Sequence, residues 1–228
     1  MSKSNCSLCQ FWHSSIGKKI IVAVTGAVLV AFLLGHLTGN LLMYMGAEAF
    51  NDYAKFLHTM LHGAGVWIAR IVLLTCLVLH VVATICLVRA NKAAKGQNYE
   101  NKETSVASGS SRIMIWSGLT ILAFVVFHIL HYTTRSTNAK LAELGDSGNA
   151  YGMVIEGFKS IPVSLFYIIA ITLLCSHLSH GVASIFQTLG LRTRGNAKLI
   201  ECFAKGYTAL IWVGFISIPV AVLTGLLK

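Results

Sequence analysis

The sequence predicts an all-α membrane protein with five transmembrane helices. Of its 228 residues, 55% are hydrophobic and only 11% are charged, whereas a soluble domain of this length carries far more charge. Five separate apolar runs interrupt the polar sequence, and only helices satisfy every backbone polar group within a segment that crosses a membrane in this way. We therefore treat residues 1–228 as a single transmembrane domain.

Each apolar run is long enough to cross about 30 Å of hydrocarbon at a rise of about 1.5 Å per residue. The first run is too long, and too well continued by further spans, to be a cleaved signal sequence. The polar segment 90–111, rich in Lys, Asn, Gly and Ser, is expected to connect the second and third spans. The predicted spans are residues 20–45, 66–88, 113–132, 163–189 and 207–227.

Basic residues indicate how the chain is oriented, because loops on the cytoplasmic side of a membrane are enriched in Lys and Arg. The distribution predicts a cytoplasmic N-terminus, and it accounts for the net charge of +10 without nucleic acid. The membrane is expected to be a bacterial inner membrane. Twelve of the 18 Lys and Arg residues fall on the side of the N-terminus: Lys3, Lys18, Lys19, Arg89, Lys92, Lys95, Lys102, Arg112, Arg192, Arg194, Lys198 and Lys205.

Four of the five spans carry a histidine deep within apolar sequence: His36, His80, His128 and His177. A titratable side chain in the hydrocarbon region is costly and indicates a functional site. Neutral imidazole is a common axial ligand of haem iron. Four ligands on four helices therefore predict a bundle that encloses two bis-histidine b-type haems. A haem-free transporter with a histidine relay is the alternative, but it predicts acidic partners, and the five spans contain no Asp or Glu.

The depth of each histidine predicts how the four are paired. His36 and His128 lie roughly 22–24 Å from the cytoplasmic ends of their spans, whereas His80 and His177 lie roughly 12–18 Å from theirs. His36 with His128 would form an outer pair, and His80 with His177 an inner pair. Two stacked haems follow, one nearer each membrane face.

Two further histidines share a helix face with a predicted ligand. His131 follows His128, and His180 follows His177, in each case by three residues. The number of histidines alone does not decide which member of each couple is the ligand. The other member could bind a haem propionate, a quinone or the backbone.

Other contacts are expected near the two membrane faces. Ser14 and Arg112 lie at the cytoplasmic ends of spans, where they could contact the propionates of the inner haem. The outer segment 46–62 is predicted to form an amphipathic helix. Within it, Glu48, His58 and His62 are candidates for proton exchange at a quinone site, although its charges could equally be solvated.

Several segments resemble the dihaem cytochrome b membrane anchor of succinate dehydrogenase and fumarate reductase. The resemblance covers essentially the whole chain. It is strongest in SSIGKKIIVAVTG (14–26), GHLTGN (35–40), GAEAFNDYAKFL (46–57), SGLTILAFVVFHILHYT (117–133) and HLSHGVASIFQTLGL (177–191).

The family's ligand register selects His128, which follows Gly118 by ten residues, and His177, which precedes Gly181 by four. The family also pairs the first helix with the third and the second with the fourth. The resemblance implies two hydrophilic partners on the cytoplasmic side, an FAD-containing flavoprotein and an iron–sulfur subunit. It implies electron transfer to or from a membrane quinone, with menaquinone as the expected quinone and its reaction on this subunit.

The chain cannot carry out the dicarboxylate chemistry itself, because it has neither a dinucleotide fingerprint nor a cysteine array for iron–sulfur clusters. A cytochrome b subunit of a hydrogenase or formate dehydrogenase is the second redox interpretation. The GAEAFN segment and the position of Gly118 favour the first.

Overall fold

A computed structural model of the chain describes residues 7–94 and 114–228, and every regular element in these two ranges is a helix. Five of the helices are long and apolar enough to cross a membrane, so the predicted number of spans is confirmed and the chain is a multi-pass membrane protein. The elements are α1 (Ser7–His13), α2 (Ser15–Leu41), η1 (Leu42–Met45), α3 (Ala47–Thr59), η2 (Met60–Gly63), α4 (Ala64–Ala94), α6 (Met114–His128), the π-helix η3 (Ile129–Thr133), α7 (Ala139–Asp146), α8 (Ala150–Lys159), α9 (Ile161–Thr188) and α10 (Ala197–Leu223).

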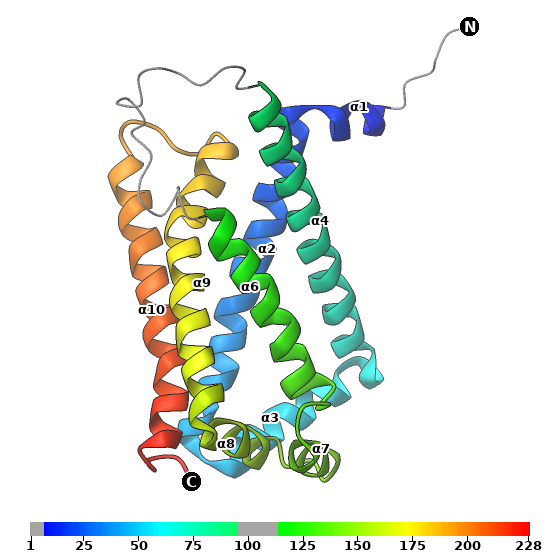
Figure 1. The fold of residues 1–228 in the computed structure, drawn as a ribbon, viewed down its shortest axis with the longest axis vertical. Coiled ribbons are helices and arrows are strands. Elements are labelled where there is room, and N and C mark those ends of the chain that lie inside the picture. Colours follow the sequence, from blue (N-terminus) through cyan, green and yellow to red (C-terminus); the bar gives the residue numbers. More distant parts are fainter. Residues whose placement is uncertain (1–6, 95–113) are drawn as a thin grey trace, which may run out of the picture.

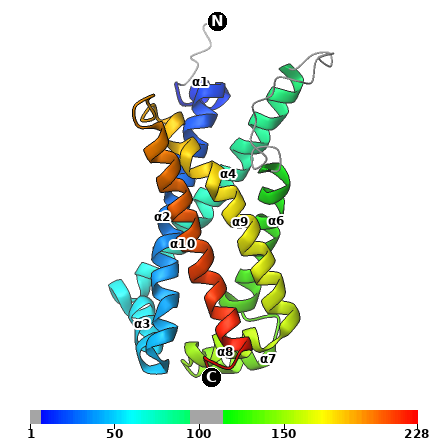
Figure 2. The ribbon, with the colours of Figure 1, turned by 90° about the vertical axis from the view of Figure 1, so that its left-hand side faces the viewer.

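The five long helices run along the longest dimension of the molecule (Figure 1). Helix α1 lies across one end, and α3, α7, α8 and the C-terminus lie at the other, as the perpendicular view also shows (Figure 2). We call these the inner and outer ends, after the predicted orientation. Successive long helices alternate in direction, as five consecutive spans require.

Most helices extend beyond the predicted spans. Helix α10 begins at Ala197, ten residues before the apolar run, and α2 begins at Ser15. The Ser14 hydroxyl caps α2 by accepting a hydrogen bond from the backbone N–H of Gly17 at 2.8 Å. Hydropathy marks only the part of a helix that suits hydrocarbon, and the helix itself continues into polar sequence.

The two short outer helices α7 and α8 were not predicted. Each begins at an asparagine whose side chain accepts a hydrogen bond from the first turn: Asn138 from Lys140 N–H and Asn149 from Gly152 N–H. Asparagine is a favoured N-cap residue. These two positions are the local signals that could have predicted both helices.

The largest fully buried side chains of the long helices lie on α2, α9 and α10. Leu37 and Ile211 are almost completely buried there. The Tyr207 hydroxyl on α10 donates to the Val30 carbonyl on α2 at 2.6 Å. The Trp212 indole donates to the Thr172 hydroxyl on α9 at 3.1 Å. These bonds satisfy polar groups that would otherwise be costly within the membrane.

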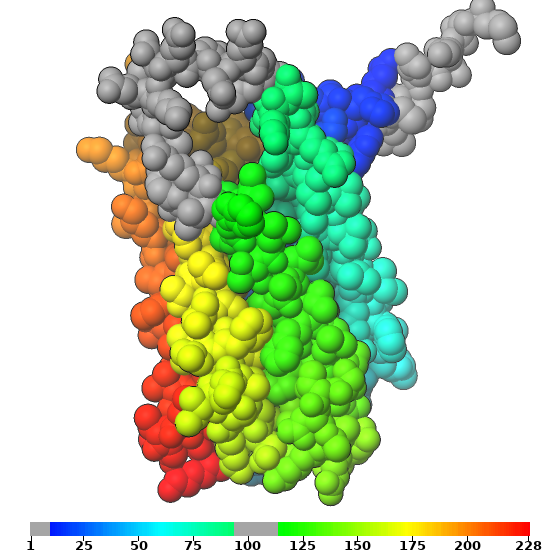
Figure 3. Space-filling model, in the orientation of Figure 1, coloured from blue at the N-terminus to red at the C-terminus, as the bar shows by residue number. Residues whose placement is uncertain are grey.

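Helices α4 and α6 are attached to this core on one side each. Helix α4 packs along α2, and α6 packs along α9. Figure 3 shows the face that α6 and α9 form, with α4 and α10 at its two sides. Many apolar side chains of α4 are exposed, among them Ile71, Leu74 and Val78. An apolar surface of this extent is expected to face lipid.

The contact between α2 and α10 depends on a missing side chain at Gly214. A Cβ at this position would lie 2.6 Å from Leu37 Cδ1 and 2.8 Å from Cδ2. Gly214→Leu should therefore destabilise the bundle by about 1–3 kcal/mol, the usual cost of overpacking. Unfolding of the purified protein by SDS in detergent micelles would measure this. Gly206→Leu on the same helix is the matched control, because a Cβ there meets nothing within 4 Å. Equal stability of the two variants would contradict the prediction.

Candidate functional site

The structure brings His36 and His128 together near the outer end. Their ring centroids are 5.8 Å apart, with an angle of 83° between the ring planes. This separation would allow both rings to hold one metal ion between them, since metal–nitrogen bonds are about 2 Å long. Phe32 stacks on the His36 ring at 5.2 Å, and Phe124 lies 5.8 Å from the His128 ring. The outer pair is thus enclosed by aromatic side chains.

His80 and His177 occupy a second level nearer the inner end, close enough to each other to interact electrostatically. Each has a hydroxyl partner on a neighbouring helix. His80 Nδ1 lies 3.2 Å from Thr25 Oγ1 on α2, and His177 Nδ1 lies 3.3 Å from Ser117 Oγ on α6.

The distance between the outer and inner levels can be estimated from residue spacing along α2 and α6. Thr25 precedes His36 by 11 residues, and Ser117 precedes His128 by the same number. Eleven residues make about three helical turns, so hydroxyl and histidine lie on one helix face, roughly 16 Å apart. Each hydroxyl is also followed by a glycine, Gly26 or Gly118. Helices α2 and α6 thus share one pattern: each places a hydroxyl at the inner level and a histidine at the outer level. This spacing is the sequence signal that could have predicted the two hydroxyl partners.

Both pairs join helices at opposite corners of the bundle. Helix α2 packs against both α4 and α9, and α9 also packs against α6. The outer pair links α2 with α6, and the inner pair links α4 with α9. A flat ligand between opposite helices can receive one side chain on each of its faces.

The hydroxyl partners favour one tautomer of the inner histidines. Thr25 donates its own hydrogen to the Ile21 carbonyl at 2.7 Å, and Ser117 donates to the Met114 carbonyl at 3.1 Å. Each hydroxyl oxygen is then free to accept from the histidine, in the tautomer whose Nδ1 carries the hydrogen and whose Nε2 keeps its lone pair. This is the form that ligates a metal through Nε2, with the other ring nitrogen bonded to a fixed partner.

Two histidines at each level are too few side chains for a structural metal ion but would suffice to hold a haem. Within the described ranges no group of three or more His, Cys, Asp or Glu side chains could hold an ion, whereas structural metal ions usually need four protein ligands. Haem iron receives its other ligands from the porphyrin. A Cβ at Gly35, next to His36, or at Gly181, one turn beyond His177, would meet nothing within 4 Å. Gly35 is exposed on the surface of α2, whereas Gly181 is half-buried, so the structure shows open space only at the position one turn beyond His177.

A second histidine accompanies the outer pair. His131 is buried, and its Nδ1 lies 3.1 Å from the Tyr167 hydroxyl, which also lies 3.2 Å from His128 Nδ1. Tyr167 on α9 was not predicted as a site residue, because no spacing on its own helix indicates which residue it meets on α6. His180 lies one turn beyond His177 and within electrostatic range of it.

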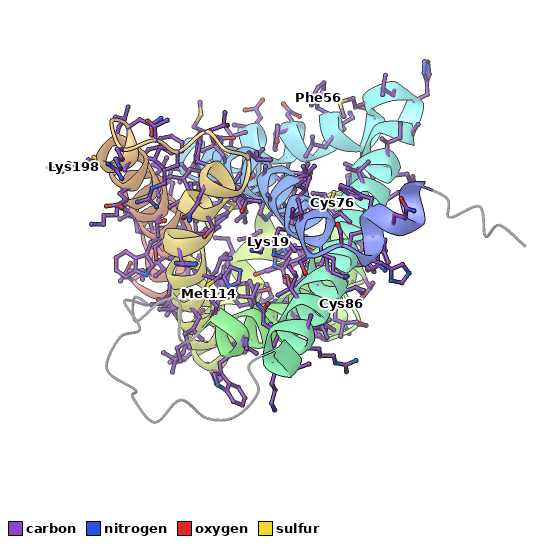
Figure 4. All side chains as sticks on the ribbon, turned by 90° about the horizontal axis from the view of Figure 1, so that it is seen from above. Lys19, Phe56, Cys76, Cys86, Met114 and Lys198 are labelled. Carbon is purple, nitrogen blue, oxygen red and sulfur yellow. The ribbon has the colours of Figure 1, made fainter. Side chains whose placement is uncertain are left out.

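The predicted propionate contacts lie at the inner end or outside the described residues. Ser14 caps α2 and donates its hydrogen to the Phe11 carbonyl at 2.9 Å, so this hydroxyl is already engaged. Arg112 lies outside the described ranges. Seen along the bundle from above (Figure 4), Lys19 lies near the centre, whereas Phe56 and Lys198 lie at the periphery. Lys19 is thus a basic side chain near the centre of the bundle in this end-on view.

Three of the predicted quinone or proton residues lie on the surface at the outer end. Glu48 and His58 are exposed on α3, and His62 is exposed on η2. The amphipathic helix predicted over residues 46–62 is shorter than expected. It ends at Thr59, because Leu61 and His62 adopt φ values of 52° and 56°, outside the helical region.

One carboxylate at the outer end is held in an ion-pair cluster. Lys159 Nζ donates to Glu156 Oε2 at 3.1 Å, and Lys140 Nζ lies 3.3 Å from the same oxygen. The Lys159 hydrogen bond holds the pKa of Glu156 below its ordinary value, against a contribution from burial, and Lys140 adds to the lowering. Glu156 therefore stays ionised at neutral pH and is not a candidate proton donor.

Comparisons of the chain with known protein families, curated proteins and solved structures found no match. The class of protein therefore follows from the fold and the site alone. It is a multi-pass helical membrane protein with two histidine pairs at two levels of its bundle.

Proposed function

We propose that this chain is a dihaem cytochrome b that anchors a succinate:quinone oxidoreductase in the membrane. The observation that carries the proposal is the placing of four histidines as two pairs on opposite helices, at levels roughly 16 Å apart. In this proposal His36 and His128 hold the outer haem, and His80 and His177 hold the inner haem.

Residues of the chain would orient the histidines that hold the two haems and would shield the haems from water. Thr25 and Ser117 keep the inner histidines in the tautomer that presents Nε2. Aromatic side chains around His36 and His128 exclude water from the outer site. When bound, the haems supply one-electron transfer between the two membrane faces. Electron transfer would therefore take place within the bundle and would not need a mobile segment.

The partners follow from the sequence resemblance. A flavoprotein with FAD and an iron–sulfur subunit would dock at the inner end, and a membrane quinone, expected to be menaquinone, would react near the outer haem. The exposed Glu48, His58 and His62 lie on that side and would exchange protons with the medium. The inner end carries Lys18 and Lys19, which suit the anionic propionates of the inner haem.

The first test is the ratio of haem to protein in the purified chain, measured as pyridine haemochrome together with a dithionite-reduced spectrum. We expect two b-type haems per chain. A single haem would contradict the use of all four histidines as ligands. A folded preparation without haem would overturn the proposal and favour the histidine relay.

A further inference from the structure

Tyr167 joins two histidines of another helix through one hydroxyl group. It lies on α9 with only 3% of its surface exposed. Its oxygen is 3.2 Å from His128 Nδ1 and 3.1 Å from His131 Nδ1. The α-helix gives way to a π-helix at Ile129, where the Thr134 N–H donates to the Ile129 carbonyl at 2.9 Å. The wider turn changes the angular step between residues, and both histidine rings contact one tyrosine.

A phenol has a single hydrogen to donate. If Tyr167 donates to one Nδ1, that ring carries its hydrogen on Nε2, and the other ring donates its Nδ1–H to the phenol oxygen. The two histidines then hold opposite tautomers. A ring with hydrogen on Nε2 cannot ligate a metal through that nitrogen, whereas its neighbour can.

We propose that Tyr167 is a positioning residue that makes His128, rather than His131, the ligand of the outer haem. His128 donates Nδ1–H to the phenol oxygen and presents a free Nε2. Tyr167 donates to His131 Nδ1, which leaves His131 with hydrogen on Nε2 and unable to compete through that nitrogen. This inference rests on the proposed function and explains how one of two histidines three residues apart is selected.

The hydrogen-bond acceptors of the histidine Nδ1–H groups also differ between the two haem levels. Each inner histidine has its own acceptor, because Thr25 and Ser117 donate their hydrogens to backbone carbonyls. At the outer level the acceptor for His128 Nδ1–H is the Tyr167 oxygen. This oxygen is polarised because Tyr167 donates its own hydrogen to His131. An acceptor on Nδ1–H makes imidazole a stronger ligand and stabilises oxidised iron. Loss of the Tyr167 hydroxyl should therefore raise the potential of the outer haem alone.

The experiment is a redox titration of the purified, haem-containing chain with Tyr167→Phe, followed by optical and EPR spectra. We expect two haems per chain, an upward shift in one midpoint potential and a changed EPR signal for that haem only. His36→Ala, which should retain only the inner haem, identifies which potential belongs to which level. Tyr132→Phe is the matched control, since it removes a buried hydroxyl of the same aromatic cluster that has no hydrogen-bond partner among the described residues. It should leave both potentials unchanged.

A second variant keeps the test decisive if Tyr167→Phe does not fold. His131→Leu should retain both haems, with a smaller upward shift of the outer potential, because Tyr167 loses the acceptor for its hydrogen. Loss of the outer haem in His131→Leu, or unchanged potentials in Tyr167→Phe, would overturn the inference while two wild-type haems still support the proposed function. A wild-type chain without haem would overturn both.

Discussion

Replacing His36 or His128 by alanine is expected to remove one haem, and the same haem in both variants. Replacing His80 or His177 should remove the other. The His36 and His128 rings lie together, and His80 lies near His177, so each haem of the proposal would lose one of the two histidines that hold it. Haemochrome absorbance should fall to about half in all four variants, and the spectrum that remains should be common to each pair.

The control for these variants is His13→Ala, at an exposed position on α1, which should retain both haems. Different remaining spectra for His36→Ala and His128→Ala would show that the two do not share a haem. Loss of a haem in His131→Ala but not in His128→Ala would overturn the assignment of the ligand on α6.

Turnover of the reconstituted complex is expected to generate a membrane voltage. The two levels are separated by roughly 16 Å along helices that cross about 30 Å of hydrocarbon. Electrons that enter at an outer quinone site and leave at the inner end would cross much of the membrane's insulating layer. Quinol oxidation should therefore make the inner side negative, as read by a voltage-sensitive dye in proteoliposomes.

An ionophore that collapses the voltage should abolish the dye signal while turnover continues. If the complex turns over quinol in sealed vesicles and the dye does not respond, the quinone site lies on the inner side. That result would contradict an outer site but leave the haem assignment intact.

Most of the fold could be predicted from the sequence. The apolar runs predicted the number of long helices, because a chain in hydrocarbon has few other ways to satisfy its backbone. The helix ends were less accurate, as in α10, because hydropathy does not detect a helix that continues into polar sequence. The short helices α7 and α8 were missed for the same reason, since their asparagine caps are only local signals.

The candidate site was predictable only in part. Depth along each helix indicated that His36 lies level with His128, and the structure brings these two rings together. Depth could not identify Tyr167, because a contact across the bundle depends on how two helices are rotated about their own axes. The π-helix after His128 changes that rotation within a single turn.

The sequence by itself determined that this chain is a bundle of membrane helices with four histidines at two depths. Composition and the rise per residue are enough to predict these features, because each feature depends on one helix at a time. Only the tertiary structure decided which side chains complete the histidines. Thr25, Ser117 and Tyr167 reach them from neighbouring helices, through hydrogen bonds between residues 36 to 60 positions apart. Such contacts depend on the packing of small and large side chains between helices, as at Gly214 and Leu37, which no pattern within one helix encodes.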